Sequence, residues 1–495
     1  MTAVVALHLK KFQVQLIATL LDLRSRFSQK IYSIAVINTL IVLFQVVYLV
    51  IRFKYINAFV PFWYTQTWGD VQLAQKSFLY IIPAISMLIT LSGLFFIIPL
   101  KRYYVRYGID VVLFFTLLGN SILTYSLLRI IFNASIPFPP LVDPVHLELI
   151  VPGLVAFFAM YYLIPHFIAY ADENDLMTNP TIHSHPGMLL VEAAARGGGV
   201  VYAVLFLIIA VFFIGFPRNL IPFYVSLGLL AILSFIDDYQ NTHPESKLRF
   251  MENPYLRLTA LFLIVSIVSS FSIKIFAVTS PLGGIFTFNS YFISLFFTIV
   301  WIVWVINVLS WSNGIDGQYG GIVGIASLLI VFLALRFEQL EPIHETVALL
   351  GAVSAGLSFG LTKYTWHPSK IMWGFGAMCA GLVLSVLSIL INSKILTSVV
   401  IILIPFLDAS VIFVRRILQG KNPLKGDRGH LHHMLLNRGW SIRKIAVFYW
   451  ITTALFGLLG LFTADTFTVQ VGLILVGVVA FGLTILNLKF TSERK

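Results

Sequence analysis

Apolar runs of about 20 residues recur along nearly the whole 495-residue chain, and they limit its fold more than any other feature. A helix needs about 20 apolar residues to cross the hydrocarbon core of a bilayer, whereas the strands of a membrane barrel are short and alternate in polarity. The composition is 59% hydrophobic and 11% charged, with a mean hydropathy of +0.92, which no soluble domain could solvate. The sequence therefore predicts an all-α integral membrane protein.

Run lengths predict about 3 spans in an N-terminal membrane region, residues 1–147, and about 11 spans in a polytopic core, residues 148–495. A proline-rich connector, "ASIPFPPLVDP", separates the two regions. The first three spans are expected near 31–53, 76–99 and 108–133. The others are expected near 149–170, 198–217, 220–236, 256–278, 285–308, 321–336, 346–361, 370–392, 396–414, 445–463 and 467–489. The N-terminal region carries no catalytic motif, so its role is left open.

Loop charge predicts the orientation, because Lys and Arg favour the cytoplasmic side of a membrane. Counting the predicted spans places basic segments such as 101–108 on one side of the membrane and the acidic segment 337–345 on the other. The formal charge of +12 is therefore expected to face anionic lipid rather than nucleic acid. The same count places four polar segments on the cytoplasmic side, where together they can form one site at the membrane surface. These segments are 179–199, 235–250, 307–321 and 425–441.

Three aspartates directly follow predicted spans. Asp237 and Asp238 come after "LGLLAILSFI", where ionised carboxylates are costly unless they are paired or bound to a metal. Asp316 lies between glycines in "NGIDG", which taken alone could be a simple turn. Carboxylate oxygens suit Mg²⁺, which takes one or two carboxylates and completes its shell with water and phosphate. We expect Asp316 and Asp237 as metal ligands, with Mn²⁺ as the alternative ion.

Positive and histidine side chains lie in the same set of loops. Arg196 precedes three glycines, where free backbone N–H groups and the arginine could hold a phosphate, although a plain membrane anchor is equally consistent. Lys247 adds positive charge for an anionic substrate. The loop "KGDRGHLHHMLLNRGWS" contains Arg428 and three histidines, which favour contact with a phosphate group over a zinc site. The histidines are His430, His432 and His433.

The segment 406–441, "FLDASVIFVRRILQGKNPLKGDRGHLHHMLLNRGWS", resembles the signature of the polyprenyl-phosphate N-acetylhexosamine-1-phosphate transferases, in the bacterial branch that uses undecaprenyl phosphate. "FIDD", "NVLSWSNGIDGQYGG" and "RGGG" resemble other motifs of that family and occur in the family's order. The resemblance covers roughly residues 148–490 and the family's eleven-span architecture. It implies transfer of a sugar 1-phosphate from a UDP-N-acetylhexosamine to undecaprenyl phosphate at the cytoplasmic face, which releases UMP and starts a cell-envelope glycan.

The resemblance also implies roles for individual residues. Asp316 would bind Mg²⁺, and Asp237 with Asp238 would assist the metal or the lipid-phosphate nucleophile. The histidines of the loop would act in catalysis at the pyrophosphate. Substrate-binding residues would be Arg196, Lys247, Asn307, Asn313 and Arg428. Membrane lipid is an expected partner, nucleic acid is not, and a homodimer is left open.

The sequence departs from the family pattern at several positions. The first acid of the family's DG-X-DG loop is Asn313, and the segment "WGFGAM", 373–378, has no acid. The first loop lacks the usual lysine. Three alternatives stay open: a UDP-muramoyl-pentapeptide donor, a catalytically impaired membrane scaffold, and a transporter. Against the transporter, the acids lie in loops rather than mid-membrane, and the chain shows no internal repeat.

Overall fold

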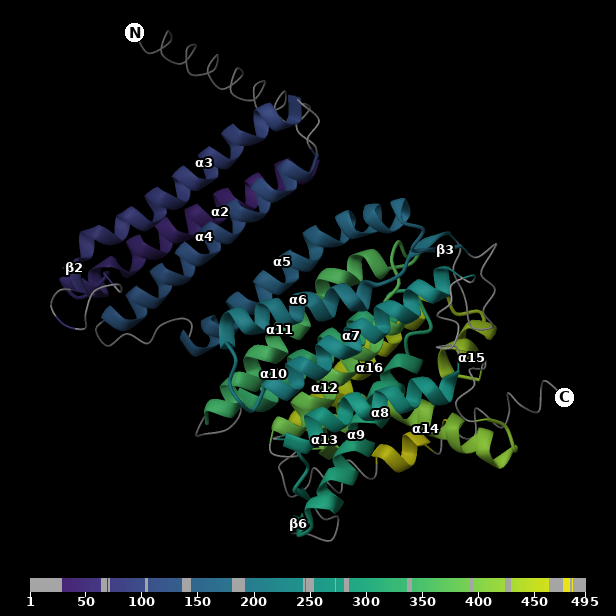
Figure 1. Cartoon of the computed structure of the whole chain (residues 1–495). Helices are drawn as coiled ribbons and strands as arrows, with labels where there is room; N and C mark the ends of the chain where they lie inside the picture. Colours follow the sequence, from purple (N-terminus) through teal and green to yellow (C-terminus); the bar gives the residue numbers. More distant parts are fainter. Residues whose placement is uncertain are drawn as a thin grey trace, which may run out of the picture. The chain divides into compact units, whose positions relative to one another are not determined.

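The protein is described by a computed structural model in which the chain forms two compact units, Met1–Val151 and Pro152–Lys495 (Figure 1). The described residues are 29–63, 69, 72–102, 106–135, 144–179, 192–243, 245, 253–271, 273–279, 285–335, 341–391, 395–422, 429–462, 475–480 and 483. Among them, 9 helices are long and apolar enough to cross a membrane, and three shorter apolar helices accompany them. The prediction of an all-α, multi-pass membrane protein is confirmed.

The first unit is built on three long helices, α2 (Gln29–Arg52), α3 (Ile81–Arg102) and α4 (Arg106–Ala134), which pack side by side (Figure 1). Between α2 and α3 the chain forms a small cap. The cap consists of η1 (Phe53–Tyr55), the antiparallel strands β1 (Phe59–Pro61) and β2 (Leu73–Gln75), and η3 (Lys76–Tyr80).

A buried polar layer joins the three helices of the first unit. The Gln45 side-chain amide donates to Ser86 Oγ at 2.9 Å and to Thr124 Oγ1 at 2.7 Å. Asn120 Nδ2 donates to Asn38 Oδ1 at 2.7 Å. Apolar helices in lipid gain little from burying one another, so interhelical hydrogen bonds of this kind help to fix which faces meet. The layer therefore sets the register of the bundle.

The second unit contains the remaining elements. Its first helix, α5 (Pro144–Glu173), begins in the residues assigned to the first unit. The other helices are α6 (Gly198–Ile214), α7 (Ile221–Thr242), α8 (Pro254–Phe271), α9 (Tyr291–Trp311), α10 (Gln318–Leu335), α11 (Pro342–Thr365), η5 (Gly374–Gly376), α12 (Ala377–Leu390), α13 (Ile395–Ile401), α14 (Leu403–Leu418), α15 (Leu431–Asn437) and α16 (Ile442–Phe462). Two short hairpins complete the unit, β3 (Met177–Thr178) with β4 (Ala194–Ala195) and β5 (Ala277–Thr279) with β6 (Ile285–Thr287).

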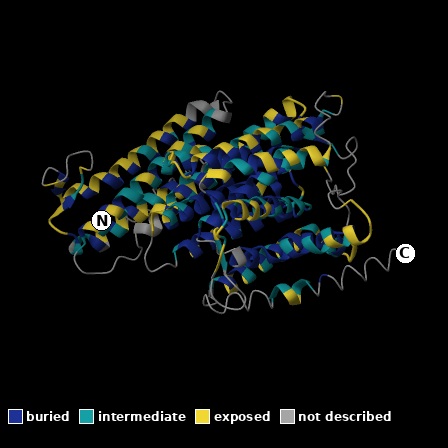
Figure 2. Ribbon diagram, turned by 60° about the horizontal axis from the view of Figure 1, so that its bottom comes forward, coloured by how far each residue is buried: buried dark blue, intermediate teal, exposed yellow. Residues whose placement is uncertain are grey.

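The core of this unit lies around α10, α11 and α12. In the most apolar stretches of α10 and α11, 78% of the residues are buried, compared with 22% in α8. Figure 2 shows the buried residues gathered inside the bundle and the exposed ones on its outer helices. Helices that are apolar on every side, as these are, must be surrounded either by other helices or by lipid. The central helices thus form a rigid frame for the loops at their ends.

Three predicted spans differ from the structure. The span at 396–414 is interrupted at Ile402, between α13 and α14, because Pro405 has no N–H to donate to the carbonyl of Ile401. The spans at 256–278 and 285–308 are shorter than predicted, since α8 ends at Phe271 and α9 begins at Tyr291. The β5–β6 hairpin occupies the chain between them. Most of the span predicted at 467–489 lies outside the described residues.

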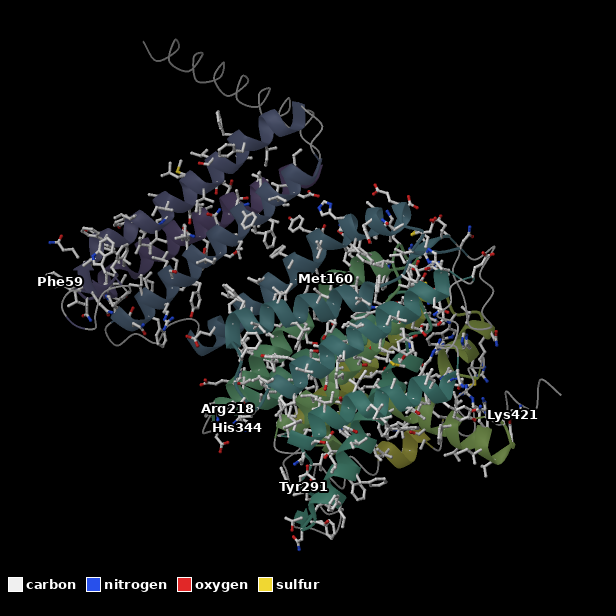
Figure 3. The ribbon with its side chains drawn as sticks, in the orientation of Figure 1. Phe59, Met160, Arg218, Tyr291, His344 and Lys421 are labelled. Atoms are coloured by element: carbon white, nitrogen blue, oxygen red, sulfur yellow. The ribbon has the colours of Figure 1, made fainter. Side chains whose placement is uncertain are left out.

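The polar loops of the second unit collect at one end of its helices. Figure 3 shows Lys421 at that end and both Arg218 and His344 at the other. The hairpin β3–β4 and helix α15 lie at the Lys421 end (Figure 1). Loops predicted to face opposite sides of the membrane, those around His344 and Lys421, thus lie at opposite ends of the bundle.

Candidate active site

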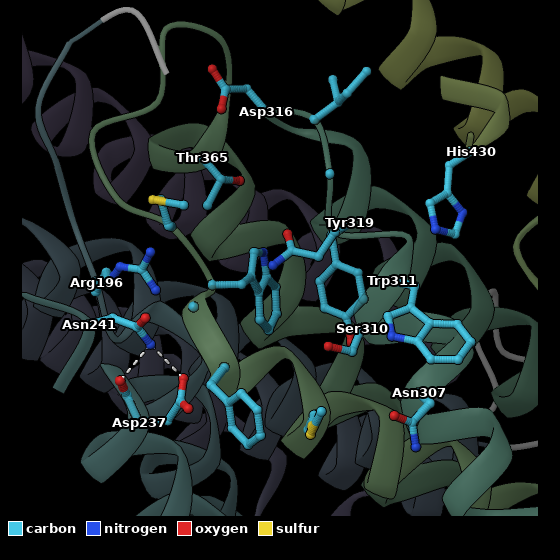
Figure 4. Close-up of a pocket in the computed structure, with 18 of the residues that line it drawn as sticks. Arg196, Asp237, Asn241, Asn307, Ser310, Trp311, Asp316, Tyr319, Thr365 and His430 are labelled. Atoms are coloured by element: carbon cyan, nitrogen blue, oxygen red, sulfur yellow. Dashed lines mark hydrogen bonds between the residues drawn. The ribbon is translucent and has the colours of Figure 1, made fainter. Parts of the chain in front are cut away.

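A cavity of about 480 Å³ opens among the polar loops of the second unit (Figure 4). Its walls come from segments far apart in the sequence: the chain after β4, the ends of α7 and α9, the loop before α10, the segment around η5 and the start of α15. It is lined by eight of the residues predicted from the sequence: Arg196, Asp237, Asn307, Asn313, Asp316, His430, His432 and His433. The four predicted polar segments therefore contribute to one site.

The two adjacent aspartates at the end of α7 are both buried, and each faces an arginine. Asp237 Oδ1 lies 2.5 Å from Arg257 Nη2, and Asp238 Oδ1 lies 3.5 Å from Arg196 Nη1. Asn241, one turn further along α7, donates to Asp237 Oδ2 at 2.8 Å. Carboxylates inside a membrane protein are tolerated when such partners compensate their charge. Arg257, from α8, was not predicted as a site residue.

Asp238 also contacts the segment that lacks the family's acid. The backbone N–H of Phe375 donates to Asp238 Oδ1 at 3.0 Å, whereas the buried Oδ2 has no hydrogen-bond partner. Gly374 has a φ of +63° and lies so close that a Cβ there would collide with the carboxylate of Asp238. In this chain, the "WGFGAM" segment thus supplies a backbone donor to the aspartate pair.

Arg196 is held in place by the short hairpin that precedes it. Its Nε donates to Thr178 Oγ1 at 2.5 Å, and its neighbour Ala195 bridges to Ile371. The prediction that the glycine N–H groups are free for a phosphate is wrong for two of them. Gly198 N–H donates to Met372 O and Gly199 N–H donates to Trp373 O, both at 3.0 Å. These two glycines allow the backbone of α6 to pack closely against the η5 segment. Arg196 is the group of this segment that faces the cavity.

Asp316 lies on a different wall of the cavity from Asp237 (Figure 4). Its Oδ2 is 2.8 Å from His367 Nδ1, and its Oδ1 accepts a hydrogen bond from Ser369 Oγ at 2.9 Å. The backbone of His367 is held in turn by Arg443, whose Nη2 donates to its carbonyl at 3.0 Å. His367 and Ser369 come from the loop after α11, and the sequence had not indicated either of them.

The three histidines lie together at the start of α15, but they differ in environment. His430 Nδ1 is 2.9 Å from Asp408 Oδ2 on α14. The rings of His430 and His432 are stacked at 5.5 Å, and those of His432 and His433 are 4.4 Å apart. Burial lowers the pKa of His432 well below its usual 6.5, with smaller effects from His430 and His433, and its Nδ1 has no partner. Burial therefore disfavours the charged form of His432.

Some predicted residues lie outside the described part of the chain, namely Lys247 and Arg428. Asp238, by contrast, is described and contacts Arg196, but it is not among the residues that line the cavity. Among the residues missed, Asp408 had a usable signal, because it is an ionisable residue within the apolar run "IILIPFLDASVIF".

The cavity contains carboxylates of the kind that bind metal ions. Within the described ranges, no group of three or more His, Cys, Asp or Glu side chains is arranged to hold one. Magnesium, however, requires only one or two carboxylates and takes its other ligands from water and phosphate. Asp316 and Asp237 both line the cavity, and Asp238 keeps an unpartnered buried oxygen. Carboxylate oxygens suit Mg²⁺ or Mn²⁺, but Asp316 and Asp237 lie on different walls of the cavity (Figure 4), and their choice as ligands of one ion stays a prediction.

The fold and the cavity define a class of protein: a polytopic helical membrane protein whose polar site, built from acids, arginines and histidines, lies at one end of its bundle. Comparison with known families narrows this class. Residues 220–392 match the model of glycosyl transferase family 4. The matched segment is similar to that family, as the motifs of the chain had indicated.

Curated proteins similar to the chain have related names. One is the decaprenyl-phosphate N-acetylglucosaminephosphotransferase of Mycolicibacterium smegmatis, 27% identical over 257 residues, which cover 47% of this chain and 61% of the relative. A second is the probable undecaprenyl-phosphate N-acetylglucosaminyl 1-phosphate transferase of Bacillus subtilis, 29% identical over 163 residues, 31% of this chain and 44% of the relative. A third is the phospho-N-acetylmuramoyl-pentapeptide-transferase of Borrelia garinii subsp. bavariensis. It is 26% identical over 261 residues, which cover 49% of this chain and 73% of the relative. The chain spans less than two thirds of the length of the first two.

Proposed function

We propose that this protein transfers an N-acetylhexosamine 1-phosphate from a UDP-sugar to a membrane polyprenyl phosphate, with undecaprenyl phosphate as the expected acceptor. The observation that carries the proposal is the cavity in which Asp237, Asp316 and the three histidines line one space at the end of a membrane bundle. Such a site lets a lipid phosphate and a water-soluble nucleotide meet. We place it at the cytoplasmic face, on the basis of the loop charges.

The reaction exchanges one phosphoanhydride bond for another. An oxygen of the lipid phosphate attacks the phosphorus that bears the sugar, and the bond from that phosphorus to the oxygen of the UMP phosphate breaks. The products are a sugar-diphospholipid and UMP. Because the attacking phosphate is already largely ionised near neutral pH, the site must chiefly neutralise charge and align the two phosphates. No covalent intermediate with the protein is needed.

The cationic and acidic residues divide this work. Mg²⁺, or Mn²⁺, would supply charge neutralisation at the pyrophosphate when held by Asp316 and Asp237. Arg196 and Arg257 face the aspartate pair, and an arriving phosphate would compete with those carboxylates for the two guanidinium groups. His430 and His433 line the same cavity and would contact the bound substrates.

The identity of the donor is the main alternative within the family. A relative named phospho-N-acetylmuramoyl-pentapeptide-transferase matches 49% of this chain, so a muramoyl-pentapeptide donor belongs in the test. In this chain Leu431 separates His430 from His432, which favours the N-acetylhexosamine branch, whose loop has this spacing.

The test is UMP release by the purified full-length protein with undecaprenyl phosphate, Mg²⁺ and a panel of UDP-sugars that includes UDP-muramoyl-pentapeptide. We expect release that requires the lipid and stops with EDTA, and the active donor names the sugar. Asp316→Asn removes a proposed ligand, and Asp175→Asn is a matched control at an exposed position with a φ of 55°, which asparagine tolerates. A folded protein that releases no UMP with any donor would refute the transferase proposal and favour the scaffold.

A further inference from the structure

Asp408 is a buried carboxylate in the apolar first half of helix α14. It is 4% exposed, and both of its oxygens are engaged at the start of α15. Oδ1 accepts the backbone N–H of Leu431 at 2.9 Å, and Oδ2 lies 2.9 Å from His430 Nδ1. Its contacts join two segments that are 22 residues apart in the sequence.

These two contacts determine where His430 carries its proton. A carboxylate can only accept hydrogen bonds, so His430 Nδ1 must be the donor to Asp408. In a neutral imidazole the other ring nitrogen, Nε2, then carries the lone pair. His430 lines the cavity, and its Nδ1 is occupied by Asp408, so Nε2 is the nitrogen available to a ligand.

A purely structural role would not require a carboxylate at this position. An asparagine or serine oxygen could equally accept the Leu431 N–H, and burying an ionised group among apolar helices is costly. What a neutral side chain cannot do is accept from Leu431 N–H and from His430 Nδ1–H with two equivalent oxygens. The pairing therefore points to control of the histidine rather than to anchoring of α15 alone.

We propose that Asp408 is a positioning residue that holds His430 in the Nδ1–H tautomer, so that Nε2 is presented to the substrates as a hydrogen-bond acceptor. This inference rests on the proposed transferase function for its kinetic consequence. The tautomer itself is a property of the protein without substrate. In this role His430 accepts a hydrogen bond from a substrate hydroxyl or from metal-bound water, whereas Arg196 and Arg257 meet the anionic groups.

Asp408→Asn tests the proposal with almost no change in shape. If Oδ1 of the asparagine keeps the Leu431 N–H, its Nδ2 faces His430 Nδ1 as a donor. Nδ1 must then accept, and the proton moves to Nε2. In catalytic triads, replacing the acidic residue that holds the histidine in its correct tautomer lowers kcat severely. We expect kcat to fall by about 100-fold or more while KM for the UDP-sugar stays within about twofold.

The tautomer is read directly by solid-state NMR of the full-length protein in lipid bilayers, labelled with ¹⁵N-histidine, at about pH 8, where ordinary imidazoles are neutral. The His430 signals are assigned from their loss in His430→Gln. We expect Nδ1 protonated and Nε2 unprotonated in the unsubstituted protein, and the reverse in Asp408→Asn. Asp175→Asn should change neither the spectrum nor kcat.

The outcomes separate this inference from the proposed function. A proton on His430 Nε2 in the unsubstituted protein would overturn the inference, and this measurement needs no enzymatic activity. Full kcat in an Asp408→Asn protein with an inverted tautomer would also overturn it. An unsubstituted protein that has the expected tautomer but releases no UMP would refute the transferase reaction while supporting the positioning contact.

Discussion

Gly374→Ala perturbs the aspartate pair through the backbone that supports it. Gly374 has a φ of +63°, and an added Cβ would collide with the Asp238 carboxylate. Gly420 has a nearly equal φ of +65°, but a Cβ there meets nothing within 4 Å. Both alanines therefore incur a similar backbone cost of about 1–2 kcal/mol, and only the alanine at 374 displaces Asp238. The difference between the two variants isolates the contribution of that carboxylate.

The size of the effect follows from the contact that is lost. When Asp238 moves away, the hydrogen bond from Phe375 N–H, at 3.0 Å, is broken. A hydrogen bond to a charged group contributes about 1.5–3 kcal/mol. If that contribution is present in the transition state, turnover falls by about 13- to 160-fold, at 1.36 kcal/mol for each factor of ten. The Gly420→Ala protein should retain turnover close to that of the unsubstituted protein.

The assay is lipid-dependent UMP release at saturating donor, with thermal unfolding measured on the same detergent-solubilised samples. We expect both variants to lose similar thermal stability from the shared backbone strain, with an additional loss at Gly374, and only Gly374→Ala to lose turnover beyond tenfold. Equal turnover in the two variants would show that the position of Asp238 does not matter to the reaction. The reasoning about the aspartate pair would then be wrong.

Three further predictions use the same preparations. Asp316→Asn and Asp237→Asn should each abolish metal-dependent UMP release while leaving the protein folded, and full turnover in either would remove that residue from the proposed metal site. Arg257→Leu leaves Asp237 buried without its ion-pair partner and should lower the free energy of unfolding by about 3 kcal/mol, at the low end for a buried pair because Arg257 is 28% exposed. The double variant Arg257→Leu/Asp237→Asn should recover most of this loss in a denaturation assay. His432 has a lowered pKa when folded, so its contribution to stability is full above about pH 6.5 and declines as the pH falls below it, because only the unfolded chain then takes up the proton. His432→Gln should lessen the drop in unfolding temperature between about pH 8 and 5.5, and an unchanged drop would contradict the burial argument.

The sequence predicted the architecture well because membrane helices are long apolar runs, which can be found without knowing the periodicity of their hydrophobic residues. Runs near 20 residues mark the helices directly, and most of the predicted spans correspond to described helices. The failures occurred where a local rule interrupts a long run, as Pro405 does between α13 and α14. The β5–β6 hairpin was missed because its residues are as apolar as the spans that flank it.

The site was predicted from the cost of charge in apolar surroundings, which identifies acids but not their partners. Asp237 and Asp316 stood out because each follows an apolar run, and both line the cavity. Arg257 and His367 did not, because a single basic residue near a helix start or a single histidine in a loop is common on any membrane surface. Their importance arises only when the bundle brings α8 beside α7 and the loop after α11 beside the loop before α10.

The partners of the acids also explain why the site tolerates so many of them. Asp237 and Asp238 face arginines, Asp316 contacts a histidine and a serine, and Asp408 contacts a histidine. Each pairing comes from a different helix or loop, so no short motif contains both members. Buried carboxylates without these partners would destabilise the bundle by several kcal/mol each. The paired acids can therefore remain in a membrane protein before any substrate arrives, and the arginines among the partners are the same groups that an incoming phosphate would engage.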